Sequence, residues 1–122
     1  MAKTILTVDD SKSMRELLKL ALLSQGFAVT QAINGVDGLA VLSGGPAPDV
    51  IITDINMPEM NGFEFIENVR KRDAYKGIPI LVLTTESDAA KKDRARKAGA
   101  TGWVVKPFDT VKLADAIRRV AA

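Results

Sequence analysis

Short β-rich runs alternate with amphipathic helical segments along the whole chain, and this alternation restricts the possible folds more than any other feature. The β-rich runs are residues 5–8, 27–32, 50–53, 78–83 and 103–105. The helical segments are centred on residues 14–22, 36–40, 63–69, 87–98 and 113–120. Five strand–helix repeats in 122 residues predict one α/β domain, a doubly wound, five-stranded parallel sheet with helices on both faces.

Local signals suggest where the helices begin and end. Ser13 and Glu16 have capping-box spacing at the start of the first helix, and Gly26 is expected to end it. Asn34-Gly35 suits a hairpin turn, but apolar residues return at helical spacing over 36–40. A loop that leads into a helix is therefore expected there.

The chain contains neither cysteine nor histidine. Disulfides, thiolate sites, histidine-ligated zinc, Ser–His–Asp triads and imidazole bases are therefore excluded. Any chemistry must use carboxylates, lysine, hydroxyls or backbone groups. No apolar run approaches the roughly 20 residues that cross a bilayer, and Met1-Ala2-Lys3 leads into a strand instead of a signal peptide. A cytoplasmic protein is expected.

The net charge of +2 is unevenly divided along the chain. Residues 1–61 contain four basic and seven acidic side chains, whereas residues 62–122 contain thirteen and eight. A basic second half could bind nucleic acid. Its basic residues are interleaved with acids and lack aromatic neighbours that would stack on bases, so solvated helix surfaces are favoured and no nucleic-acid partner is expected.

Polar residues follow four of the five predicted strands. They are Asp9-Asp10, Asp54, Thr84-Thr85-Glu86 and Lys106-Pro107. In open parallel sheets, polar chemistry gathers beyond the carboxyl ends of the strands, so these side chains are expected to converge on one crevice. A single acid there would more often be a helix cap or turn residue, and a single lysine a surface residue. Polar residues at four strand ends together indicate a site.

The acidic side chains of this set point to a divalent cation. Two carboxylates about 4 Å apart repel by about 4 kcal/mol at a protein surface, so three must protonate, separate or hold a cation. Oxygen ligands favour a hard ion, Mg²⁺ before Ca²⁺. Such a metal suits phosphate chemistry, in which Lys106 and Thr84 could contact phosphoryl oxygens. Asp54, alone at the end of the central strand, is the best candidate nucleophile for an aspartyl-phosphate.

With these residues the sequence resembles the receiver domain of bacterial two-component response regulators, in its single-domain chemotaxis (CheY-like) form. The resemblance covers essentially the whole chain, and its motifs are specific as an ordered set. They lie at residues 8–11, 48–54, 56–62, 83–86, 97–100 and 105–108. The resemblance implies a flavodoxin-like sheet with the strand order 2-1-3-4-5 known for these regulators. It also implies one receiver domain over residues 1–122, without an output domain.

The resemblance assigns roles to the acidic residues. Asp54 would accept a phosphoryl group from a phosphohistidine on a CheA-like sensor histidine kinase. Asp10, Asp54 and the main-chain carbonyl of Asn56 would ligate Mg²⁺, the expected cofactor, and Asp9 would act through a water. The chain would catalyse only its own phosphorylation and dephosphorylation, so it is not expected to be an enzyme in the ordinary sense.

The remaining site residues receive roles in the same way. Lys106 would pair with the phosphoryl group, with a cis bond to Pro107, and Thr84 would move toward that group. Asn56 and Glu86 occupy positions at which the family tunes the phosphoryl lifetime, and an amide and an acid there resemble the fast-decaying chemotaxis type.

The switch aromatic is usually Tyr or Phe in this family, but here it is Trp103. An indole is larger, and its N–H group only donates, so full burial requires an acceptor. Trp103 either turns inward as Thr84 moves or packs at the rim against the basic helix, and both interpretations stay open.

Signalling would depend on the helix over residues 87–98. Few large apolar side chains hold it, so its alternative positions should differ little in free energy. A partner protein would bind the face formed by this helix, the strand at Trp103 and the last helix. The basic residues of that face are Lys91, Lys92, Arg96, Lys97 and Arg119. The chain is expected to be a monomer that binds the flagellar motor switch. The alternative is that it acts as a phosphate sink or as a relay receiver.

Two other classes of protein fit less well. Magnesium phosphatases of the haloacid type need an acid two residues after the nucleophilic aspartate, where this chain has Asn56. Flavodoxin-like flavin carriers need a phosphate-binding loop after the first strand, where Asp9 and Asp10 would repel phosphate.

Overall fold

A five-stranded parallel sheet forms the middle layer of the structure, a computed structural model that describes residues 2–122. The strands are β1 (Thr4–Val8), β2 (Ala28–Ala32), β3 (Val50–Thr53), β4 (Ile80–Thr84) and β5 (Gly102–Val105). Their order across the sheet is β2-β1-β3-β4-β5. The expected fold class and strand order are confirmed.

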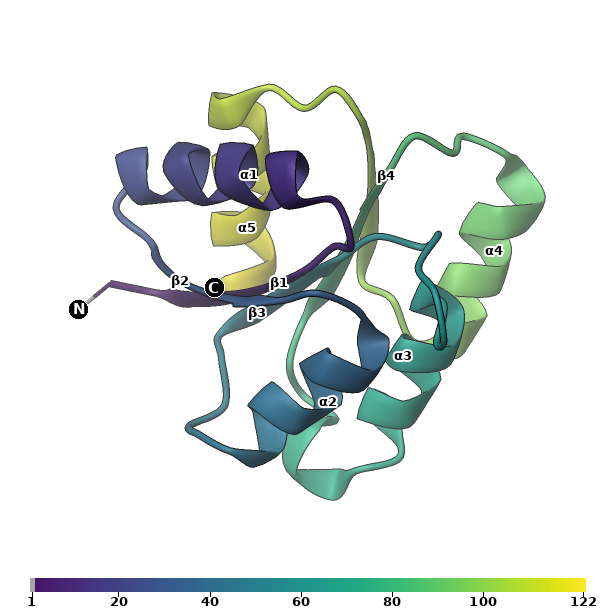
Figure 1. The fold of residues 1–122 in the computed structure, drawn as a ribbon. Helices are drawn as coiled ribbons and strands as arrows, with labels where there is room; N and C mark the ends of the chain where they lie inside the picture. The colour runs from purple at the N-terminus through teal and green to yellow at the C-terminus, as the bar shows by residue number, and fades with distance from the viewer. Residues whose placement is uncertain (1) are drawn as a thin grey trace.

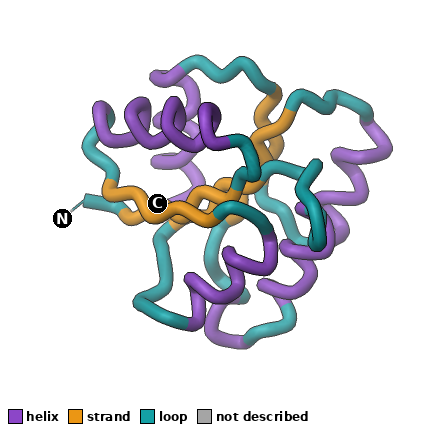
Figure 2. Tube along the Cα trace, in the orientation of Figure 1, coloured by secondary structure: helices purple, strands orange, loops and turns teal. Residues whose placement is uncertain are grey.

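Helices cover both faces of the sheet (Figure 1). They are α1 (Lys12–Ser24), α2 (Gly35–Ser43), α3 (Gly62–Arg70), α4 (Ala89–Ala98) and α5 (Thr110–Ala121), with a short 3-10 helix η1 (Asp73–Tyr75). α1 and α5 lie on one face, and α2, α3 and α4 lie on the other. Figure 2 shows the strands, in orange, between the two groups of helices. Within residues 2–122, no helix is both long enough and apolar enough to cross a membrane.

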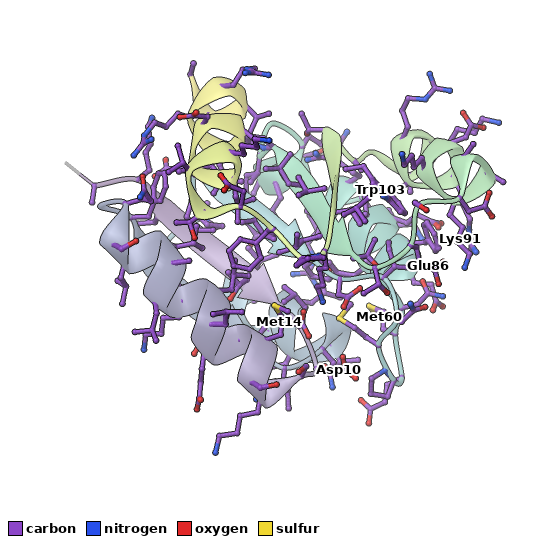
Figure 3. All side chains as sticks on the ribbon, turned by 90° about the horizontal axis from the view of Figure 1, so that it is seen from above. Asp10, Met14, Met60, Glu86, Lys91 and Trp103 are labelled. Carbon is purple, nitrogen blue, oxygen red and sulfur yellow. The ribbon has the colours of Figure 1, made fainter. Side chains whose placement is uncertain are left out.

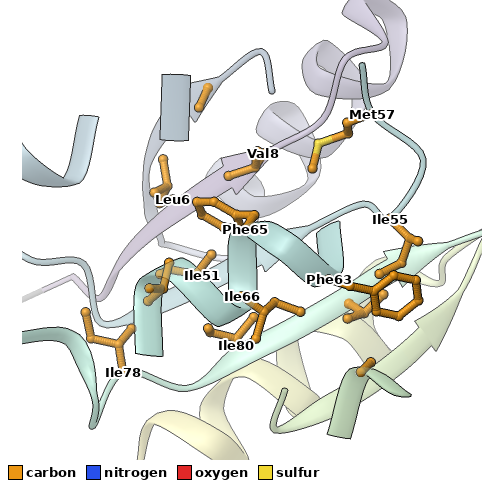
Figure 4. Packing of buried hydrophobic residues seen from close by; sticks show 14 of the residues in the cluster. Leu6, Val8, Ile51, Ile55, Met57, Phe63, Phe65, Ile66, Ile78 and Ile80 are labelled. Carbon is orange, nitrogen blue, oxygen red and sulfur yellow. The ribbon is translucent and has the colours of Figure 1, made fainter. Parts of the chain in front are cut away.

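Each buried strand contributes to both hydrophobic cores, because successive side chains point to opposite faces of a sheet. In β4, Ile80 and Val82 pack with the helices α2, α3 and α4, whereas Leu81 and Leu83 pack with α1 and α5. Phe65 of α3 is fully buried in the first of these cores (Figure 4). The nearly continuous apolar runs of the central strands are thus explained by burial on both sides.

The first helix begins earlier than its sequence pattern predicts. Ser11 is the N-cap residue, and its hydroxyl accepts a hydrogen bond from the Met14 N–H at 3.3 Å. The capping box expected from Ser13 and Glu16 is therefore wrong, because the chain turns into the helix directly after β1. The prediction for the other end is close: α1 ends at Ser24, and Gly26 follows with a φ of 89°.

The second helix forms where it was expected, but it turns a different face to the core. Its buried residues are Gly35, Gly38 and Leu42, whereas Val36 of the apolar pattern is 47% exposed. A Cβ atom on Gly38 would lie 2.8 Å from the Phe65 ring. The helix therefore packs through glycines that make room for an aromatic ring from α3, and hydrophobic periodicity cannot reveal such a face.

Two boundaries near the carboxyl edge of the sheet also differ from the prediction. β4 covers Ile80–Thr84 instead of residues 78–83, so Thr84 is its last residue. α4 begins at Ala89 after the N-cap Asp88, two residues later than expected. Ala95 is the one buried residue of α4. This agrees with the expectation that few apolar contacts hold this helix.

Candidate functional site

The register of the sheet brings the predicted polar residues to one edge. Val8 of β1 pairs with Thr53 of β3, so the next residues, Asp9 and Asp54, leave the sheet side by side. At the other side of the site, the Lys106 N–H group donates a hydrogen bond of 2.8 Å to the carbonyl oxygen of Thr84. The residues after β1, β3, β4 and β5 therefore meet at the carboxyl ends of the strands.

Three carboxylates form the acidic part of this site. Asp9, Asp10 and Asp54 each offer an oxygen atom, and these oxygens lie within 4.8 Å of one another. Asp9 is buried, Asp54 is half-buried and Asp10 is exposed. The prediction that these acids converge is thus confirmed. All the side-chain donors of this cluster are carboxylate oxygens, which suit a hard cation such as Mg²⁺.

Lys106 lies between two of these acids. Its Nζ donates hydrogen bonds to Asp9 Oδ2 at 3.0 Å and to Asp54 Oδ2 at 2.8 Å. Burial favours a lower pKa for Lys106, but its hydrogen bonds with Asp54 and Asp9 and the attraction of their negative charges together outweigh burial and raise the pKa above its ordinary value. One ammonium against three carboxylates leaves a formal charge of about −2, which a divalent cation would balance.

Backbone groups hold both of the paired carboxylates in place. Asp9 Oδ1 accepts the Ser11 N–H at 2.9 Å, and Asp54 Oδ1 accepts the Ile55 N–H at 2.6 Å. The Arg15 guanidinium reaches back from α1 and donates to the main-chain oxygen of Asp9 at 2.8 Å. Sequence reasoning missed Arg15, because nothing in its sequence pattern separates it from an arginine on a solvated helix face.

Gly62 supports the site through its lack of a side chain. It begins α3, and its N–H donates to the Ile55 carbonyl oxygen at 2.8 Å. A Cβ atom at this position would lie 2.7 Å from Ile55 Cα and closer still to the main-chain oxygen of Asp54. Only glycine allows α3 to approach the backbone beside Asp54 this closely. Gly62 belongs to the motif at residues 56–62, but the sequence did not reveal its packing role.

Glu86 connects the edge of the site to β5 and α4. Its N–H donates to Thr84 Oγ1 at 3.4 Å, and its carbonyl oxygen accepts the indole N–H of Trp103 at 2.9 Å. Its carboxylate accepts the amide N–H of Asn56 at 3.5 Å and pairs with Lys91 Nζ at 3.1 Å. Figure 3 shows Glu86, Lys91 and Trp103 close together beside α4. The sequence analysis had named Glu86 and these four partners, but it could not predict the contacts between them.

Thr84 and Trp103 occupy different places relative to the acids. Thr84 is fully buried, and no hydrogen bond within residues 2–122 joins it to Asp54. Trp103 is half-buried and packs against the core beneath α4, with its indole donor satisfied by Glu86. The acceptor that a buried indole requires is therefore present. The Lys106–Pro107 peptide bond is cis, as expected.

Comparison with known proteins identifies relatives over most of the chain. A family described as the response regulator receiver domain matches residues 5–118. Chemotaxis protein CheY1 of Helicobacter pylori is 42% identical over 105 residues, covering 85% of each chain. The structure of Vibrio cholerae chemotaxis protein CheY4 superposes with a TM-score of 0.92 at 43% identity, covering 98% of this chain and 99% of that one. The sensor histidine kinase CheAY of Helicobacter pylori is 32% identical over 94% of this chain and 14% of that protein.

Proposed function

The chain belongs to the response regulator receiver family, as a chemotaxis member of CheY type, and from this we propose that Asp54 accepts a phosphoryl group from a phosphohistidine of a sensor histidine kinase. The observation that supports this most strongly is the Lys106 ammonium between Asp9 and Asp54, in a cluster of three carboxylates. Such a cluster holds an acceptor carboxylate and a cationic group together at one edge of the sheet.

We propose Mg²⁺ as the cofactor of this reaction. Asp10, Asp54 and the main-chain oxygen of Asn56 would hold the ion, and Asp9 would act through a water. The fit rests on the all-oxygen donor set and on the excess negative charge that Lys106 leaves uncompensated. When bound, the ion would supply positive charge that stabilises the developing charge on the phosphoryl oxygens.

The protein's own groups would carry out the transfer. A carboxylate oxygen of Asp54 forms the new bond to phosphorus, while the bond from phosphorus to the histidine nitrogen breaks and the nitrogen keeps the electron pair. Lys106, already 2.8 Å from Asp54, donates to a phosphoryl oxygen, and Thr84 turns its hydroxyl toward another. Water later attacks the phosphorus, releases inorganic phosphate and restores Asp54. Asn56 and Glu86 at the rim would control that water.

Glu86 would transmit the conformational change from the phosphorylation site to β5 and α4. Movement of Thr84 alters the loop whose carbonyl holds Trp103 and whose carboxylate holds Lys91. Because Ala95 is the one buried residue of α4, a small change in free energy suffices to reposition that helix. We propose that the α4-β5-α5 face then binds a flagellar motor switch protein in the cytoplasm. A phosphate sink or relay receiver would use the same acceptor site.

Trp103 offers a direct test, since it is the single tryptophan of the chain. Acetyl phosphate with Mg²⁺ is expected to change its fluorescence and to add the mass of one phosphoryl group to the protein. Chelating the metal with EDTA should prevent both changes, because Mg²⁺ is part of the proposed acceptor site. An unchanged intact mass in the presence of Mg²⁺ and acetyl phosphate would contradict the proposal.

Replacing Asp10 by Asn is expected to have opposite effects on stability and on metal binding. Without metal, removing one of three neighbouring negative charges should raise the free energy of unfolding by about 1 kcal/mol, since Asp10 is exposed and its repulsion is screened. Losing a carboxylate ligand should weaken Mg²⁺ binding by roughly tenfold or more.

Urea unfolding in EDTA and a Mg²⁺ titration of Trp103 fluorescence would measure the two effects. Asp115→Asn is the matched control. Asp115 is an exposed residue of α5, and this substitution removes the same charge as Asp10→Asn does. An Asp10→Asn protein that is less stable than the parent in EDTA would rule out charge crowding at the site.

A further inference from the structure

A cleft of about 460 Å³ lies between α3 and α4, on the other side of α4 from β5. Four of its six lining residues are basic. The lining residues are Glu67, Arg70, Lys71, Arg94, Lys97 and Ala98. The proposed phosphorylation does not use this cleft, and of its four basic residues only Lys97 was also assigned to the α4-β5-α5 face. The positive charge of Arg70, Lys71 and Arg94 is therefore unexplained by the receiver function.

Arg70, one of the lining residues, is held in place by hydrogen bonds to main-chain oxygens. Its Nε donates to the Gly99 carbonyl oxygen at 3.0 Å, and one terminal nitrogen donates to the carbonyl oxygens of Tyr75 at 3.0 Å and Lys76 at 3.1 Å. These acceptors are neutral, so the guanidinium keeps its net charge. Burial lowers the pKa of Arg70, which reflects a charge that is partly removed from water.

Arg94 is also ordered by its surroundings. Its guanidinium carbon lies 4.1 Å from the centroid of the Phe63 ring, in cation–π geometry. Two guanidinium groups thus reach the cleft from different helices, and each is positioned before any ligand arrives. Preorganised groups lose less conformational entropy on binding than free side chains do.

Most of the positive charge in the cleft has no internal partner. Within residues 2–122, no carboxylate oxygen lies within 4.0 Å of the charged nitrogens of Arg70, Lys71 or Arg94. Lys97 pairs with Asp93 at 3.0 Å, but both side chains are well exposed, and such pairs contribute little. The cleft is therefore available to an anionic ligand.

We propose that this α3–α4 cleft docks an acidic peptide segment of a protein partner. Charge complementarity supports an anion, and the lack of an aromatic side chain among the lining residues favours a peptide over a nucleic acid. Phe63 is only 4% exposed and is covered by Arg94, so its ring offers no platform for base stacking. Glu67 would repel an uninterrupted phosphate backbone, whereas a peptide can place a neutral residue opposite it.

Fluorescence anisotropy with a short fluorescein-labelled peptide of alternating Glu and Ser would test the docking. Binding should be detected and should weaken as salt is added. At physiological ionic strength, where charges more than about 8 Å apart are largely screened, the double variant Lys71→Glu/Lys97→Glu should lose roughly tenfold or more in affinity.

A matched variant separates the cleft from general charge. Lys92→Glu/Arg96→Glu changes the net charge equally and also removes one basic partner of Asp93, but its residues lie on the β5 side of α4. Its affinity for the peptide should stay close to that of the parent. Circular dichroism would verify folding of both variants, and Lys71→Ala/Lys97→Ala would replace the charge reversal if that protein unfolds.

Several outcomes would overturn the proposal. They are absence of binding by the parent protein, equal or larger loss in the matched variant, and NMR shift changes confined to the α4-β5-α5 face. An RNA oligonucleotide of equal charge that binds more tightly than the peptide, and loses affinity in the cleft variant, would show that the occupant is a nucleic acid. None of these results depends on phosphorylation of Asp54, so the docking and the proposed receiver chemistry stand or fall separately.

Discussion

Asp54→Asn is expected to abolish phosphoryl acceptance, because an amide lacks the anionic oxygen that would attack phosphorus. The substitution preserves the size of the side chain, and the amide oxygen can still accept the Ile55 N–H group. Lys106 keeps its hydrogen bond to Asp9. The fold should therefore remain intact while the chemistry is lost. Intact-mass measurement after incubation with acetyl phosphate and Mg²⁺ would detect the change.

Asp115→Asn again serves as the control and should gain one phosphoryl group like the parent. If the Asp54→Asn protein acquired the same mass, Asp54 could not be the acceptor.

The Asp54→Asn variant also tests whether phosphorylation controls partner binding. In the parent, phosphodonor should increase capture by an immobilised flagellar motor switch protein, and Asp54→Asn should remove that increase. A parent protein that is phosphorylated without any increase in capture would favour the phosphate sink or relay receiver.

Gly62→Ala is expected to lower both the stability and the rate of phosphorylation. The new Cβ atom would meet the Ile55 Cα at 2.7 Å and would press on the main-chain oxygen of Asp54. These are backbone atoms that cannot rotate away, so the free energy of unfolding should fall by about 2–3 kcal/mol. The displaced Asp54 should accept a phosphoryl group roughly tenfold to a hundredfold more slowly, because small misplacements of reacting groups greatly reduce the rate.

Gly77→Ala is the matched control for this substitution. No atom lies within 4 Å of a Cβ at Gly77, and its φ is not in the left-handed region. The control should leave the rate unchanged and should raise stability by roughly 0.5 kcal/mol, because alanine restricts the unfolded chain. Urea unfolding and the acetyl phosphate reaction, followed by Trp103 fluorescence, would provide both measurements. Equal stability of the two variants would show that α3 can move away from Asp54 at little cost.

The positions of Asp9, Asp54 and Lys106 at one edge were predictable because these residues follow predicted strands of a parallel sheet. Once β-rich and helical segments alternate, the carboxyl ends of parallel strands must share one edge of the sheet. Asp9, Asp54 and Lys106 follow such ends, so their convergence required no knowledge of side-chain packing. Helix boundaries and faces were less predictable. The buried face of α2 depends on where Phe65 of α3 lies, and the start of α1 depends on how the chain leaves β1.

Contacts between distant segments could be learned only from the folded molecule. Lys106 reaches Asp9 and Asp54 across sequence separations of 97 and 52 residues, and which oxygen each bond uses depends on the relative positions of three strands. The space that excludes a side chain at Gly62, the links from Glu86 to Trp103 and Lys91, and the basic cleft between α3 and α4 arise in the same way. Local patterning specifies the alternation of strands and helices and the polar residues that lie near the strand ends. Distances between such elements are decided by how their side chains fill space together.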